Sequence, residues 1–203
     1  MRNRFLPFRV SVCAMVMMIG CAPPKEDIAA PGTNPAVVIK TSLGDIRISI
    51  DEDRAPITAA NFLRYVDEAI YDGGSFFRTV HASNQPRDSI RIAVVQGGAR
   101  SDSSSHFFEP ILLERTSKTG LKHLDGTISM AREGPDTATH SFFFCIGDQP
   151  ELDFGGKRNP DGQGFAAFGH VLEGRDVIRA IQMSSHEAQR LQPPIQILSV
   201  RRE

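Results

Sequence analysis

The chain has 203 residues, a net charge of -1 at pH 7 and 40% hydrophobic residues, which suffices for one domain with a hydrophobic core. Without its first twenty residues it carries 20 basic and 24 acidic residues, because that segment holds three arginines and no acid. A mildly acidic chain without clustered lysine and arginine argues against nucleic-acid binding, which needs a basic surface.

The first twenty residues have the pattern of an export signal. Arg2, Arg4 and Arg9 accompany an apolar run over residues 10–19, which is too short to span a bilayer as a free helix. The run ends at Gly20 and Cys21, which resemble the lipobox of bacterial lipoprotein signals. That resemblance implies a lipid on Cys21 and a tether on the outer side of a membrane, in the periplasm of a Gram-negative cell. An ordinary secretory signal with an incidental cysteine is the alternative.

Residues 21–35 are predicted to be the lipidated cysteine and a flexible linker, because this stretch holds four prolines, a glycine and few apolar residues. Residues 36–203 then form the folded domain, with Cys145 as its one cysteine, so no disulfide can form within it. Cys145 follows three phenylalanines, a setting that predicts a buried strand residue rather than a reactive thiol.

The domain is predicted to be mainly β. Strands are expected at 37–40 and 46–50 around a turn, and Pro56 begins a helix that reaches about residue 69. Ile57, Leu63, Val66 and Ile70 are expected on its inner side, beside Phe62. Further elements are predicted in chain order: strands at 75–80, 91–95, 127–131, 141–146 and 165–171, a helix at 174–183 and a strand at 195–200. Because the helices do not alternate with the strands, the pattern favours an antiparallel barrel or sandwich over a doubly wound sheet.

Three groups of motifs in this region recur in a known order. The first is Ala55-Pro56 to Phe62, then Tyr71-Asp72-Gly73-Gly74 to Arg78, then Gln96-Gly97-Gly98; the second spans 126–132 and 141–144; the third holds Leu152-Asp153, residues 168–171 and Gly174. Over residues 37–200 this ordered set resembles the cyclophilin family of peptidyl-prolyl cis/trans isomerases. The resemblance implies a closed eight-stranded antiparallel barrel capped by two α-helices, one at each end.

The chemistry of that activity sets clear demands on a site. Rotation about an X–Pro bond crosses a barrier of about 18–20 kcal/mol, because the C–N bond is partly double. The twisted state loses amide resonance, so its nitrogen accepts a hydrogen bond, and a permanently charged planar donor such as arginine suits this role. An apolar pocket must hold the proline ring, while no nucleophile, metal or cofactor is needed.

The resemblance assigns these roles to individual residues. Arg78 matches the catalytic arginine, although a lone Phe-Arg pair also occurs at ordinary surface salt bridges. Gln96 matches the glutamine that binds substrate and steadies the arginine. The other positions matched to the substrate site are Phe143 and Leu152 in the proline pocket, Ala131 and Arg132 on the strand edge that pairs with the substrate backbone, and Val94, Phe165 and Ser141 around them.

Several departures from the family pattern alter the rim of this site. Residues 81–93 are longer than the usual short turn, so a larger loop is expected beside the pocket. Smaller or different side chains stand at the other positions: Phe77 for a common His, Ala93 and Val94 for Phe and Met, Ser141 for Gln, Glu151 for Trp and Phe165 for His.

Three functions are compatible with these residues. The first is an isomerase that assists the folding of exported proteins, and the second is a weakly active module that holds proline-containing segments. A structural envelope lipoprotein is the third, but it leaves Arg78, Gln96 and Phe143 without a role. The six histidines lack metal-ligand spacing, so no metal is expected. The expected partners are proline-containing polypeptides and a membrane, which the protein reaches through the lipid. The chain is expected to be a monomer.

Overall fold

The computed structural model describes residues 1, 34–86, 88–100 and 107–203. The predicted signal, Cys21 and nearly all of the predicted linker lie outside the described residues. Among the helices that are described, none is long and apolar enough to cross a membrane.

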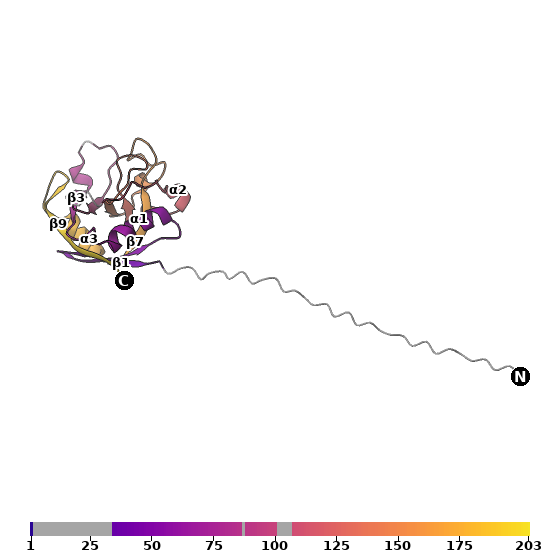
Figure 1. Ribbon diagram of the computed structural model, residues 1–203. Coiled ribbons are helices and arrows are strands. Elements are labelled where there is room, and N and C mark those ends of the chain that lie inside the picture. Colours follow the sequence, from indigo (N-terminus) through magenta and orange to yellow (C-terminus); the bar gives the residue numbers. More distant parts are fainter. Residues whose placement is uncertain (2–33, 87, 101–106) are drawn as a thin grey trace. The chain divides into compact units, whose positions relative to one another are not determined.

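Eight strands of the described chain close into an antiparallel barrel, in the order β1-β2-β7-β5-β6-β4-β3-β9, with β9 pairing back onto β1 (Figure 1). This confirms the predicted fold, and closure leaves these strands without a free sheet edge. A two-residue strand, β8 (His186–Glu187), pairs with the start of β9 as a hairpin. The barrel strands are β1 (Ala36–Thr41), β2 (Gly44–Ile50), β3 (Ser75–Val80), β4 (Val94–Gly98), β5 (Thr127–Met130), β6 (Phe142–Cys145), β7 (Ala166–Glu173) and β9 (Arg190–Arg202).

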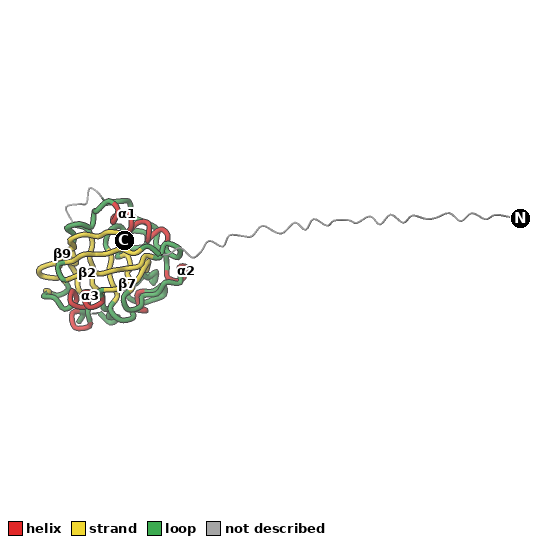
Figure 2. Tube along the Cα trace, turned by 90° about the horizontal axis from the view of Figure 1, so that it is seen from below, coloured by secondary structure: helices red, strands yellow, loops and turns green. Residues whose placement is uncertain are grey.

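Two helices cover opposite ends of the barrel, α1 (Pro56–Asp67) and α3 (Arg175–Gln182), as Figure 2 shows. A single helical turn, α2 (Thr116–Thr119), and the 3-10 turns η1 (Ala82–Asn84) and η3 (Pro150–Leu152) lie in the connections, and none of the three was predicted.

The inner side of α1 differs from the prediction at Ile57. The buried stripe runs Ala59, Phe62, Leu63 and Val66, the spacing of one helical face, whereas Ile57 is 42% exposed. The prediction for Ile57 was therefore wrong, because it assigned the first turn to the same face as the later turns.

Two strand boundaries also differ from the prediction. β4 begins at Val94 rather than at residue 91, because the backbone of Ile92 is bonded to the Gln85 side chain instead of to a neighbouring strand. β9 starts at Arg190 rather than at residue 195, although Pro193 and Pro194 interrupt it. Both prolines fall between the paired positions of β9, where their missing N–H groups cost no ladder hydrogen bond.

β6 separates the core from a second apolar cluster, because successive side chains of a strand point to opposite faces. Phe142 and Phe144 are fully buried in the main core, where Phe142 packs edge-on against both Phe76 and Phe144. Phe143 and Cys145 point the other way, into the cluster around Leu152. This second cluster forms the candidate site, and it confirms that Cys145 is a buried strand residue, 1% exposed.

Candidate active site

Two neighbouring cavities share one residue, Arg78 on β3. The smaller cavity, of about 220 Å³, is lined by Arg78, Ile92, Val94, Gln96, Ala131, Arg132, Phe143, Leu152, Arg158, Asn159 and Phe165. The larger cavity, of about 800 Å³, is lined by Ser75, Phe77, Arg78, Ala99, Arg100, Phe107, His140, Ser141, Gln189, Arg190 and Pro194. Eight of the nine matched residues therefore meet at the smaller cavity, and Ser141 lies in the larger one.

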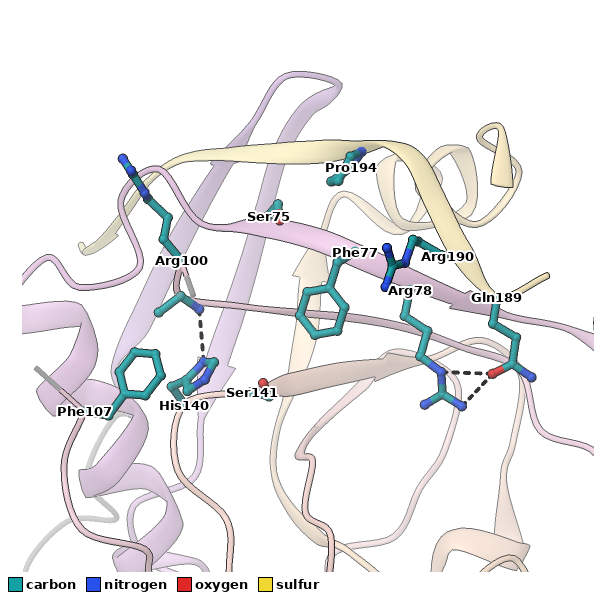
Figure 3. Close-up of a pocket in the computed structure, with 11 residues that line it drawn as sticks. Ser75, Phe77, Arg78, Arg100, Phe107, His140, Ser141, Gln189, Arg190 and Pro194 are labelled. Carbon is teal, nitrogen blue, oxygen red and sulfur yellow. Dashed lines mark hydrogen bonds between the residues drawn. The ribbon is translucent and has the colours of Figure 1, made fainter. Parts of the chain in front are cut away.

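Arg78 is held by two glutamine side chains. Its Nη1 donates to Gln96 Oε1 at 3.0 Å, from the directly paired position on β4. Its Nε and Nη2 donate to Gln189 Oε1 at 2.9 and 2.6 Å, the pair of bonds drawn in Figure 3. A guanidinium has five N–H groups, so two of them remain without a partner among the described residues. Arg78 is thus an oriented donor with capacity left for a ligand.

The guanidinium of Arg78 is partly buried. Burial lowers the pKa of Arg78, the nearby Arg158 lowers it further, and Asp88 opposes both. An arginine nevertheless stays protonated in proteins, so the guanidinium remains a cation. Partial removal from water strengthens the hydrogen bonds that a cation can donate.

The floor of the smaller cavity is aromatic and firmly supported. Phe143 is 5% exposed, meets Phe165 edge-on at a ring-centroid distance of 5.4 Å, and stacks on His123 from the other side at 6.0 Å. His123 is itself fixed by Asp153 Oδ1 at Nδ1, 2.8 Å away, and by Ser129 Oγ at Nε2, 3.0 Å away. The ring that faces the cavity therefore has little freedom to move away from a ligand.

The long loop predicted at 81–93 borders the smaller cavity. Gln85 bonds both backbone groups of Ile92, with Nε2 to the carbonyl at 2.7 Å and Oε1 from the amide at 3.2 Å, which fixes Ile92 in the cavity wall. Arg158 crosses to this loop, donating to Asp88 Oδ2 at 3.0 Å and to the carbonyl of Ile90 at 2.6 Å. Sequence reasoning missed Ile92 because it had placed Ala93 in the wall. It missed Arg158 because none of the quoted motifs includes that residue.

The side chain of Arg132 is fixed in the wall of the smaller cavity. Its side chain is 1% exposed and is held by Asp161, at 2.8 Å from Nη1, and by the carbonyl of Gly164, with Phe165 beneath it. The amide of Ala131 already donates to the carbonyl of Ser141. Backbone pairing of a substrate along this edge remains a prediction.

Gln189 contacts Arg78 in the structure but was not among the predicted site residues. It lies in the hairpin between β8 and β9, and the Asn84 side chain in η1 donates to the neighbouring Ala188 carbonyl at 3.0 Å. No motif of the resemblance includes residues 184–194, and Gln189 stands in no pattern that marks it as a site residue.

Comparison with known proteins places this geometry in a family. Residues 36–202 match the family model described as cyclophilin type peptidyl-prolyl cis-trans isomerase/CLD. Peptidyl-prolyl cis-trans isomerase A of Dickeya dadantii is 32% identical over 159 residues, which cover 78% of this chain and 76% of that protein. Peptidyl-prolyl cis-trans isomerase B of Escherichia coli is 32% identical over 155 residues, covering 72% of this chain and 83% of that protein.

Solved structures agree on the fold. A cyclophilin type peptidyl-prolyl cis-trans isomerase from Cryptosporidium parvum superposes with a TM-score of 0.67 at 19% identity, covering 84% of this chain and 98% of that one. A second crystal structure of that protein, obtained in the presence of the dipeptide Ala-Pro, gives a TM-score of 0.66. With the family model and the bacterial relatives, this shows that the chain belongs to the cyclophilin-type peptidyl-prolyl cis-trans isomerases and is an enzyme of that class.

Proposed function

We propose that the domain isomerises X–Pro bonds in exported polypeptides, with Arg78 as the catalytic residue and the smaller cavity as the proline pocket. The observation that carries this proposal is the position of Arg78. It lies at the rim of a cavity with an aromatic floor, held by Gln96 and Gln189, with two N–H groups still available.

The reaction needs binding that favours the twisted amide over both planar isomers. Phe143, Leu152 and Phe165 supply apolar surface for the proline ring, while the chain before it rotates. Arg78 then donates to the amide nitrogen, which accepts a hydrogen bond only when resonance with the carbonyl is lost. Because the two glutamines already orient the guanidinium, little reorganisation accompanies the rotation.

The test is the exchange of a short X–Pro peptide, followed by a protease-coupled assay and by NMR exchange spectroscopy. Arg78→Ala should lower kcat and kcat/KM together, by about 30- to 1000-fold if the lost donor is worth about 2–4 kcal/mol, as in oxyanion holes. Arg78→Lys should recover little, because a point charge does not reproduce the planar fork. Phe143→Ala should weaken peptide binding as well as turnover.

A binding module on the same fold is the second candidate function, and the altered rim favours it. Ser141 carries a hydroxyl instead of the amide expected there, and Ala93 leaves its part of the wall to Ile92. A wild-type protein that binds the peptide but exchanges it no faster than buffer would select this alternative. If the wild type is active and Arg78→Ala equals it, the assignment of Arg78 is wrong.

We also propose that the protein works as a monomer tethered outside a bacterial membrane, where unfolded exported chains are its substrates. The motif at Gly20 and Cys21 supports the tether, since two or three acyl chains bind a membrane stably at about 0.8 kcal/mol per buried CH₂. Cys21→Ala should release the folded domain from the membrane fraction. Equal attachment of wild type and variant would remove the tether from the proposal.

A further inference from the structure

The larger cavity has no role in the reaction described above, although it adjoins the catalytic arginine. Figure 3 shows Phe77 directed into it from β3, with Ser141 and His140 across from it and Phe107 at the far end. At about 800 Å³ it exceeds the proline pocket several-fold. Because Arg78 lines both cavities, the larger one is open to the part of a polypeptide that continues past Arg78 from the smaller one.

The lining of the larger cavity is positively charged. Arg78 and Arg190 contribute cationic side chains to it, and none of the described residues that line it is acidic. The domain as a whole carries more acidic than basic residues, so this concentration of arginines is local. A cavity lined by charges of one sign attracts ligands of the opposite sign.

Arg190 differs from the arginines of the neighbouring pocket. There, Arg132 is paired with Asp161 and Arg158 with Asp88. Arg190 is exposed and has no ion pair or side-chain hydrogen bond with any described residue. It starts β9, where it pairs in register with Arg78 on β3, and Figure 3 shows both arginines among the residues that line the cavity. Its five N–H groups are therefore available to a ligand in the cavity.

The remaining walls suit the body of a side chain rather than a free ion. Phe77, Phe107 and Pro194 provide apolar surface, and Phe107 packs on His140 with ring centroids 4.0 Å apart. His140 Nδ1 accepts from the amide of Ala99, and burial lowers the pKa of His140. A residue with an apolar stem and a terminal carboxylate matches both the walls and the charge.

We propose that the larger cavity binds the residues next to the X–Pro bond and that Arg190 makes the enzyme prefer substrates with an aspartate or glutamate there. The ligand class is thus an acidic proline-containing polypeptide segment. This inference rests on the proposed function, because it assumes that the proline occupies the smaller cavity.

The experiment compares the isomerisation of pairs of peptides that differ only by Glu against Gln at one position. One pair has this residue directly before the X–Pro unit, and the other pair has it directly after the unit. The proteins are wild type, Arg190→Gln, Arg190→Lys and the control Lys40→Gln. Lys40 is exposed on β1 and lines neither cavity, so its substitution removes the same charge from elsewhere on the domain. The readout is the Glu/Gln ratio of kcat/KM at low salt and at about 0.5 M salt, where screening shortens the range of charge interactions.

We expect the wild type to favour Glu by about two- to fivefold at one position, the range of a solvent-accessible ion pair. Arg190→Gln should bring the ratio close to one, Arg190→Lys should keep part of it, and Lys40→Gln should keep all of it. High salt should reduce the wild-type ratio. A wild type that turns over both peptides equally at every position overturns this inference alone, as does an undiminished ratio in Arg190→Gln. No exchange of any peptide overturns the proposed function and this inference with it.

Discussion

Gln189 offers a sharp test of how Arg78 is held. The substitution Gln189→Leu keeps a side chain of similar size and removes the acceptor of two of the three hydrogen bonds from the guanidinium. Only the bond from Nη1 to Gln96 then remains, and the guanidinium can turn about it. We expect the peptide to bind as before, while the donor is less often aligned with the amide nitrogen.

The size of the effect follows from those two bonds. A hydrogen bond to a charged group contributes about 1.5–3 kcal/mol, and water replaces part of it here because Arg78 is only half-buried. A net loss of about 1–2 kcal/mol in the transition state corresponds to a roughly 5- to 30-fold lower kcat. KM should change little, because the arginine acts mainly on the twisted amide.

The measurement is kcat and KM for one X–Pro peptide by NMR exchange, with folding checked by circular dichroism. Gln189→Glu should retain much of the turnover, since a carboxylate accepts the same two bonds. Gln192→Leu, which alters an exposed glutamine nearby on β9, is the matched control. A kcat for Gln189→Leu within twofold of wild type refutes the reasoning, and so does a loss that appears only in KM.

Three further predictions concern the loop, the cysteine and pH. Arg158→Ala should remove the contacts that hold the loop at Asp88 and Ile90 and raise KM for the peptide about three- to tenfold, measured by the same assay, because the wall of the proline pocket loosens. Cys145→Ala should keep the isomerase activity and lower the free energy of unfolding by about 1 kcal/mol in urea titrations, through lost packing. The free energy of unfolding should fall as the pH drops below about 6.5, the pKa of unfolded histidine, because burial lowers the folded-state pKa of His81 and His140.

Each of these three predictions would be contradicted by a specific result. An unchanged KM for Arg158→Ala shows that the loop keeps its place without the ion pair. Loss of turnover in folded Cys145→Ala gives the thiol a role that its burial argues against. The neutral forms of the two histidines stabilise the folded state above pH 6.5, and this contribution is lost as the pH falls through their lowered values. A flat stability profile between pH 7 and 5 is therefore inconsistent with the described burial.

The order of strands and helices predicted an antiparallel barrel or sandwich, and the resemblance to the cyclophilin family added the closed barrel and the residues of the proline pocket. The resemblance assigned Phe143 to the pocket, and the structure places it on the opposite face of β6 from Phe142 and Phe144, which lie in the main core. Arg78 and Gln96 were matched from separate motifs, and the pairing of β3 with β4 brings them together.

The residues that sequence reasoning missed depend on side-chain contacts and on a helix orientation that the periodicity of the sequence does not reveal. Gln189 reaches Arg78 only because β9 turns back along β3, which periodicity does not reveal. Ile92 enters the wall because Gln85 replaces a strand partner for its backbone. Ile57 was misplaced because the pattern of apolar residues gives a helix face but not its rotation in the first turn.

The pairing of β1 with β9 has a consequence for how the molecule is made. The first and last strands of the barrel are neighbours, and the amide of Glu203 reaches the carbonyl of Ala36 at 3.0 Å. A chain emerging from a ribosome or a translocation channel therefore has an open sheet with two unpaired edges until β9 has been delivered. Such contacts between distant segments are slow to form, and open edges recruit other chains. This catalyst of folding thus has a vulnerable folding step of its own, and rearranged variants that join β9 to β1 through a short linker should pass through it sooner.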